Sequence, residues 1–182
     1  MALTRWALLL RGVNVGGRGR LPMAELRAAL AAIGAEAPRT LIQSGNAVFD
    51  HPQAEPGPLA ARIEAAVEAR AGFAPAAVLL EVGALAEILA ALPAGWPAEE
   101  THVWLTAAPP SAPLPAPRRE RLQALAAPGE SWRLQGRALV LHAPGGIGRS
   151  RFAAGAEAAL GAPATARKAS VLARLLDLAR QD

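Results

Sequence analysis

Residues 6–19 read WALLLRGVNVGGRG, and this stretch decides how the chain begins to fold. The apolar run ends at Leu10, and a glycine-rich segment from Gly12 to Gly19 follows it. A short, nearly continuous apolar run before a turn is typical of a strand covered on both faces. Glycine and asparagine tolerate the left-handed backbone that tight turns need. We therefore predict a central strand over 5–11, followed by a glycine-rich loop that leads into a helix.

The segments after this loop complete a first half, predicted over residues 1–82. Pro22 suits the first helical turn, and Gly34 is a natural stop. The turn Ser44-Gly45-Asn46 separates two strand-like runs and favours a hairpin. The further expected elements are a helix over 22–33, strands over 40–42 and 47–49, a helix over 58–70 and a strand over 76–82. The order β-α-β-β-α-β is that of a ferredoxin-like unit.

A second half is predicted over residues 83–182, with a looser order of elements. The expected elements are helices over 83–92, 118–126 and 151–160, strands over 102–106, 131–134 and 137–142, and a last helix capped by Thr165. The proline-rich segment 107–117 is expected to be an extended connection. This half repeats one arrangement of the first half, in which a strand is followed by a basic glycine-rich loop and a helix. The fold class is α+β, built from two related ferredoxin-like halves.

The composition excludes several classes of site. The chain has 182 residues, 52% of them hydrophobic, and no cysteine, which rules out disulfides, thiolate metal sites and cysteine nucleophiles. Its histidines, His51, His102 and His142, share no metal-binding spacing, so we expect no metal and no cofactor. The N-terminal apolar run is too short for a signal peptide, and no stretch approaches the roughly 20 residues of a membrane span. We expect a soluble, cytoplasmic protein without a membrane partner.

Two basic glycine-rich loops are the candidate sites. A glycine-rich turn between a strand and a helix exposes backbone N–H groups, which together with the helix dipole favour an anion. Neither loop has the Gly-Lys-Ser/Thr ending of a P-loop, and both could be tight turns with no ligand. Two such loops on one face would make a cleft for phosphate or carboxylate. The candidate ligand-binding residues are Arg11, Asn14, Gly16, Gly17, Arg18, Arg20, Ser44, Asn46, Arg149, Ser150, Arg151, Thr165 and Arg167.

Each candidate also has a structural interpretation. The side chain of Asn14 can bond the backbone of its own loop, and Ser44 and Asn46 can stabilise their hairpin. Ser44 has no evident histidine or lysine partner, so no catalytic residue is assigned. Arginine is the usual cation throughout this chain, and Lys168 is the only lysine. An arginine is therefore weaker evidence for anion recognition here than in most proteins.

Outside the two loops, two features invite a nucleic-acid interpretation. The four tryptophans could stack on bases, but two of them lie in apolar strand runs, where core packing is expected. The four are Trp6, Trp96, Trp104 and Trp132, and the two in strand runs are Trp6 and Trp104. The basic run over 118–121 is expected to be a solvated helix face. The net charge of +4 is too modest to predict nucleic-acid binding by itself.

Several motifs resemble a known bacterial family, the domain of unknown function 1697. The stretch from Leu8 to Gly17 is similar to the family's opening motif, and Met23-Ala24-Glu25-Leu26 follows at the usual distance. The stretch from Thr40 to Phe49 is similar to its second motif, and 144–150 and 164–167 to its third and fourth. The resemblance implies a soluble α+β fold of two ferredoxin-like halves and no established activity. This chain has arginines around Gly19 where the family often has lysines, and Lys168 where it often has asparagine.

Three hypotheses about function stay open at this point. The first is a binding module for a phosphorylated small molecule or nucleic acid. The second is an enzyme that uses the first glycine-rich loop as an oxyanion or phosphate site. The third is a structural or interaction protein, whose signature would be an exposed apolar patch. The sequence does not give the oligomeric state, the ligand or the pathway.

Overall fold

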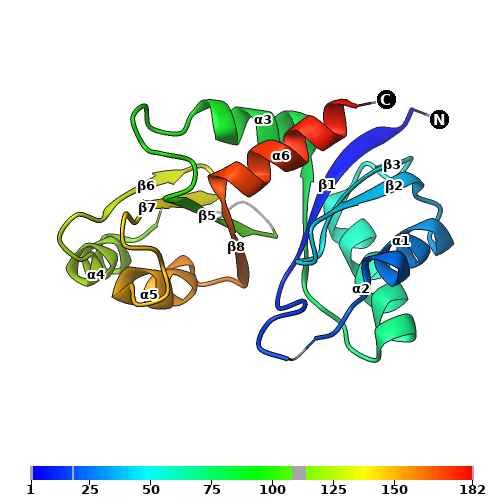
Figure 1. Ribbon diagram of the computed structural model, residues 1–182, viewed down its shortest axis with the longest axis horizontal. Helices are drawn as coiled ribbons and strands as arrows, with labels where there is room; N and C mark the ends of the chain where they lie inside the picture. The colour runs from blue at the N-terminus through cyan, green and yellow to red at the C-terminus, as the bar shows by residue number, and fades with distance from the viewer. Residues whose placement is uncertain (1, 18, 108–113, 182) are drawn as a thin grey trace. The chain divides into compact units, whose positions relative to one another are not determined.

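The computed structural model describes residues 2–17, 19–107 and 114–181, and it divides into two compact units. Unit 1 comprises Met1–Glu87 and Ala173–Asp182, and unit 2 comprises Ile88–Leu172. Within the described ranges the protein has a mixed α/β architecture, with two four-stranded antiparallel sheets and six helices (Figure 1). Helices α3 (Val82–Ala90) and α6 (Ala169–Arg180) each contribute residues to both units.

Unit 1 is built around its first strand. From this strand to β4, its elements run in the order β-α-β-β-α-β. They are β1 (Thr4–Leu10), α1 (Met23–Ala32), β2 (Glu36–Leu41), β3 (Asn46–His51), α2 (Pro56–Ala71) and β4 (Ala77–Glu81). The strands lie in the order β2-β3-β1-β4, so β1 pairs with both β3 and β4. Helices α1 and α2 pack on one face of this sheet (Figure 1). The central position of β1 follows from its apolar run, since both its faces are buried.

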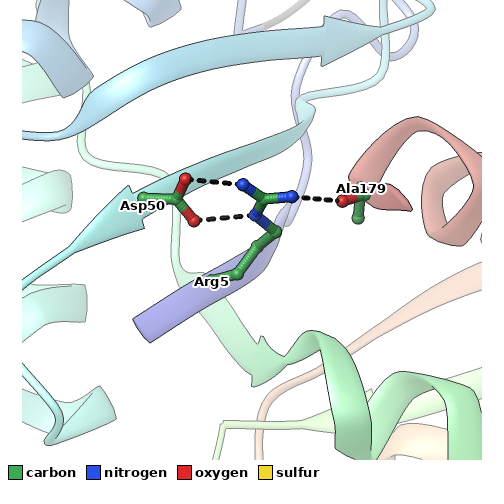
Figure 2. A network of polar contacts seen from close by, with 3 residues as sticks. All are labelled: Arg5, Asp50 and Ala179. Atoms are coloured by element: carbon green, nitrogen blue, oxygen red, sulfur yellow. Dashed lines mark hydrogen bonds and ion pairs between the residues drawn. The ribbon is translucent and has the colours of Figure 1, made fainter. Parts of the chain in front are cut away.

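Alternate residues of β1 serve the two faces of the sheet. Trp6, Leu8 and Leu10 enter the core under α1 and α2. On the other face, Arg5 forms a two-pronged ion pair with Asp50 of β3, with Nε to Oδ1 at 2.8 Å and Nη2 to Oδ2 at 2.9 Å (Figure 2). Its third nitrogen, Nη1, donates to the carbonyl of Ala179 near the end of α6 at 2.9 Å. A guanidinium is well suited to this place, because it matches a carboxylate fork and complements the negative end of a helix.

Unit 2 repeats the strand order of unit 1. Its elements are β5 (Thr101–Thr106), α4 (Ala116–Leu125), β6 (Ser131–Gln135), β7 (Ala138–His142), α5 (Arg151–Leu160) and β8 (Ala164–Lys168). The sheet order β6-β7-β5-β8 places the first strand of the unit in the centre, as β2-β3-β1-β4 does in unit 1. Helices α4 and α5 pack together over a core that includes Trp104, Leu139 and Phe152.

The main error of the sequence prediction concerns residues 164–168. We predicted that Thr165 caps a last helix, but Thr165 lies inside β8 and is paired with Leu105 of β5. The segment has only five residues and lies at the edge of the sheet. A run this short shows no clear alternation of apolar and polar residues that would mark it as a strand. Of the expected connection over 107–117, residues 108–113 lie outside the described ranges, and the end of the segment belongs to α4.

Of the helices in the described part of the chain, none has the length and apolar character needed to cross a membrane.

Candidate functional site

The first glycine-rich loop is held together by Asn14. Its side-chain Nδ2 donates to the carbonyls of Leu21 at 2.9 Å and Gln43 at 2.6 Å, and its Oδ1 accepts from the Leu21 N–H at 2.9 Å. Its own backbone N–H donates to the carbonyl of Gly19 at 2.9 Å. Asn14 has a φ of +54°, a conformation that asparagine tolerates better than most residues. One side chain thus closes the loop and ties it to the 42–45 turn.

The outer rim of this loop is glycine backbone flanked by arginines. Gly12, Gly16 and Gly17 all have positive φ, and nothing lies within 4 Å of the place where a Cβ would stand. Arg11 and Arg20 on either side are exposed. Arg18 lies outside the described residues. Open backbone beside guanidinium groups is the combination that accommodates an oxyanion.

The loop leads directly into α1. The residue before the helix is Pro22, and no side chain caps the N-terminus of the helix by a hydrogen bond. The first turn contains Glu25, whose carboxylate pairs with Arg70 of α2 at 3.0 Å. The positive end of the helix dipole therefore has a carboxylate within its own first turn, and an added anion has to be held mainly by the loop and its arginines.

The hairpin motif is tightly packed. Asn46 is fully buried, and its Nδ2 donates to Ser44 Oγ at 2.8 Å and to the Leu41 carbonyl at 3.3 Å. Gly45 has a φ of +73°, and a Cβ there would stand 2.8 Å from the Cβ of Leu10. Its carbonyl accepts from the Leu10 N–H. These contacts fix the turn against β1, and they occupy the amide that would otherwise face a ligand.

Two large apolar side chains are exposed on the same pair of turns. Val15 is 65% exposed, and Ile42 is 42% exposed with a φ of +51°. A β-branched residue in the left-handed region is strained. The bond from Asn14 to the Gln43 carbonyl joins the two turns that carry these side chains. Gln43 was not among the candidate site residues, since a residue that acts through its backbone carbonyl cannot be recognised from its side chain.

The second glycine-rich loop lies in unit 2 and ends at α5. Ser150 caps this helix, with its Oγ accepting from the Ala153 N–H at 3.0 Å. Arg149 and Arg151, which bracket Ser150, are exposed. The serine hydroxyl is thus committed to the helix, whereas the two arginines and the glycines of the loop are exposed. Helix capping explains Ser150. For the two arginines, anion binding and a purely structural role both stay open.

Thr165 and Arg167 lie on the same face of β8, two residues apart. Arg167 Nη1 donates to Thr165 Oγ1 at 2.8 Å and to the Ala166 carbonyl at 2.9 Å. Burial lowers the pKa of the Arg167 guanidinium to about 10, so the group stays charged at neutral pH. Arg137 is a comparable half-buried cation that the sequence did not single out, and it donates to the carbonyls of Thr106 and Ala107. Burial lowers its pKa as well.

Several polar side chains of these motifs are committed to contacts within the protein. Through the described parts of the chain, no three His, Cys, Asp or Glu side chains gather in a way that could hold a metal ion. The amides of Asn14 and Asn46 are engaged with the protein itself. Both loops offer a ligand positive charge and glycine backbone with open space where a Cβ would stand.

The architecture places the protein in the class of mixed α/β proteins with two four-stranded antiparallel sheets of identical strand order. A family model described as a protein of unknown function (DUF1697) matches residues 3–139, and the chain belongs to this family. The conserved bacterial protein SP0830 from Streptococcus pneumoniae is a similar solved structure, with a TM-score of 0.75 and 22% sequence identity. The match covers 98% of this chain and 100% of that one, which shows a shared fold. No curated protein matches the chain.

Proposed function

We propose that this protein is an anion-binding module whose first glycine-rich loop holds the phosphate of a phosphorylated small molecule or of nucleic acid. The observation that carries the proposal is the bracing of the loop by Asn14. Three side-chain hydrogen bonds hold the loop closed from within, while the glycine rim stays open. A rim that is ordered before the ligand arrives loses little conformational entropy on binding.

Charge supports the same proposal. Arg11 and Arg20 stand at the two ends of the loop, and both are exposed. Unit 1 as a whole has ten basic and ten acidic residues, so any attraction for an anion at this loop is local. A local site predicts that single arginine substitutions matter more than the overall charge of the protein.

The bonding of the polar side chains favours a binding module over an enzyme. Asn14 and Asn46 were the candidates for polarising a substrate, and their amides bond Leu21, Gln43, Ser44 and Leu41 instead. An interaction protein is the second candidate, favoured by the exposed Val15 and the strained, exposed Ile42.

We also propose that each half is a ferredoxin-like unit and that the protein acts in the cytoplasm. The strand orders β2-β3-β1-β4 and β6-β7-β5-β8, with two helices packed on one face, support the first statement. The absence of cysteine supports the second.

The proposal is tested by thermal unfolding of the wild type and of Arg20→Ala in inorganic phosphate, sulfate and chloride at matched ionic strength. An anion at ten times its Kd adds about 1.4 kcal/mol to the stability of the native state. We expect phosphate to raise the Tm of the wild type by several degrees over chloride. The Arg20→Ala variant should lose most of this increase.

The matched control is Arg174→Ala, which removes an exposed arginine of unit 1 from α6. It should keep the phosphate response of the wild type. Equal Tm values in phosphate and chloride, or an equal loss of response in both variants, would remove the first loop as an anion site.

A further inference from the structure

A pocket lies between α4 and the edge strand β6 of unit 2, and its lining includes no residue of either glycine-rich loop. Its volume is about 330 Å³, at the lower end of the range for small-molecule sites. The lining residues are Ala116, Arg119, Glu120, Gln123 and Trp132. The first four fall at positions i, i+3, i+4 and i+7 of α4, so they form one stripe of the helix. The pocket therefore lies between a helix stripe that carries three polar side chains and an indole ring, and most of its lining surface is apolar.

Two of the lining side chains, Gln123 and Trp132, are joined by a hydrogen bond. The Trp132 indole N–H donates to Gln123 Oε1 at 2.9 Å. Because an indole N–H can only donate, the amide oxygen of Gln123 faces the ring, and its NH₂ group is directed away from it. Trp132 also packs against Phe152, with ring centroids 5.6 Å apart and planes tilted by 45°. The ring is thus paired with the oxygen of the amide, and the NH₂ group of Gln123 is directed away from the ring.

The two neighbouring arginines at the start of α4 have different roles. The guanidinium of Arg118 lies over Gly161, the C-terminal cap of α5, where a side chain at position 161 would collide with it. That contact explains Arg118 structurally, since cations suit a helix C-terminus. Arg119 lines the pocket instead and is exposed. All four residues over 118–121 are exposed, as expected of a solvated helix face, and two of them, Arg118 and Arg119, also contact other parts of unit 2.

The charge of the whole chain is concentrated in this unit. Unit 2 has nine basic and five acidic residues, whereas unit 1 has ten of each. The net charge of +4 therefore belongs to unit 2. A positive unit with a pocket of this kind is complementary to an anionic ligand.

We propose that this pocket binds a nucleotide, either free or within a single strand of nucleic acid. The ligand has to be planar to lie against Trp132, must accept from Gln123 and donate to Glu120, and must carry an anion for Arg119. A nucleobase with its phosphate has all four properties. Base–aromatic stacking tolerates any base, so the pocket selects the class of ligand rather than a sequence. This site is separate from the phosphate site proposed for the first loop, and its failure would leave that proposal standing.

The test is an NMR titration of the full-length protein, followed at the indole N–H of Trp132. The resonance is assigned by its absence in Trp132→Phe. The probes are adenosine 5′-monophosphate, a ten-nucleotide single-stranded RNA and inorganic phosphate. We expect the indole resonance to move with the mononucleotide, the RNA or both, and this difference identifies the source of the nucleotide. A response to phosphate equal to that of the mononucleotide would overturn the proposal, and so would no response to any probe.

Two exposed arginines of α4 provide the matched pair of variants. Arg119→Ala should weaken binding about tenfold, because it removes a charge-assisted contact to phosphate. Arg121→Ala removes the same charge from the same helix but outside the pocket, and it should weaken binding less than twofold. Equal losses would mean diffuse attraction to a basic surface and would overturn the site.

Gln123→Glu is a further variant, which should keep the bond to the Trp132 indole and therefore the fold. The carboxylate still accepts from the Trp132 indole but no longer donates to a ligand, and it adds a negative charge beside Glu120. Affinity for the nucleotide should fall at least fivefold while the Tm stays near that of the wild type. Unchanged affinity in this variant would contradict the assigned role of the amide.

Discussion

Replacing Asn14 by alanine tests how the first glycine-rich loop is built. The substitution removes three side-chain hydrogen bonds, each with a net value of about 1 kcal/mol. The bond to the Gln43 carbonyl is exposed and counts for less. Alanine at a φ of +54° costs roughly 1 kcal/mol more, since its Cβ crowds the carbonyl in the left-handed region. Asn14→Ala should therefore lower the free energy of unfolding by about 2–4 kcal/mol.

The assay is urea unfolding at 25 °C, combined with hydrogen exchange of the Leu21 amide. That amide donates to Asn14 Oδ1 in the wild type, so its protection should fall in the variant. Asn14→Asp keeps the acceptor but loses both donors, and should be about as unstable as the alanine variant. The control is Gln43→Ala, because Gln43 contributes only its backbone carbonyl; its stability should stay within about 0.5 kcal/mol of the wild type. A loss below 0.5 kcal/mol in Asn14→Ala, with Leu21 still protected, would refute the bracing role.

The remaining predictions concern packing and pH. Gly45→Ala should cost about 2–4 kcal/mol in urea unfolding, because its Cβ would meet Leu10 in a left-handed backbone; Gly16→Ala has the same backbone but open space, and should cost about 1 kcal/mol. Equal losses in the two variants would contradict the packing argument. Burial lowers the pKa of His102, so the native state disfavours its protonation. Stability should therefore fall as pH decreases below about 6.5, the pKa of an unfolded histidine, and His102→Asn should flatten this part of the curve of Tm against pH. An unchanged curve in the variant would assign the pH effect to other groups.

The helices were the easiest elements to predict, because their ends are marked by residues with a local physical role. Helix α5 spans Arg151–Leu160 as predicted, and Gly161 ends it with a φ of +69°. Helix α2 likewise ends at Gly72, which has a φ of +74°. Such signals depend only on the backbone freedom of one residue, so they can be read from sequence.

Strand β8 shows where local patterns fail. Its five residues have no clear alternation, and Thr165 looks like a helix cap because α6 follows shortly after it. The strand exists because β5 supplies a partner about sixty residues earlier in the chain, with Leu105 opposite Thr165. A pairing of that kind depends on tertiary structure, which outweighs local propensity.

The candidate site was also predictable only in part. Glycines and arginines of the first loop could be singled out from the sequence, but not that the Asn14 side chain reaches the Gln43 carbonyl. The pocket beside Trp132 depends on the packing of α4 against the edge of a sheet, and Ala116 was assigned to the connection before the helix. The residue types of a loop can be read from the sequence, whereas the groups that contact them in space are set by the fold.

The central claim is that the first glycine-rich loop is an ordered site for an oxyanion. The most direct measurement is a titration of ¹⁵N-labelled protein with inorganic phosphate, followed at the backbone amides of Gly16 and Gly17. We predict saturable shifts of these amides in the wild type that are reduced by Arg20→Ala and kept in Arg174→Ala. Amides that do not move, or that move equally in both variants, would contradict the claim.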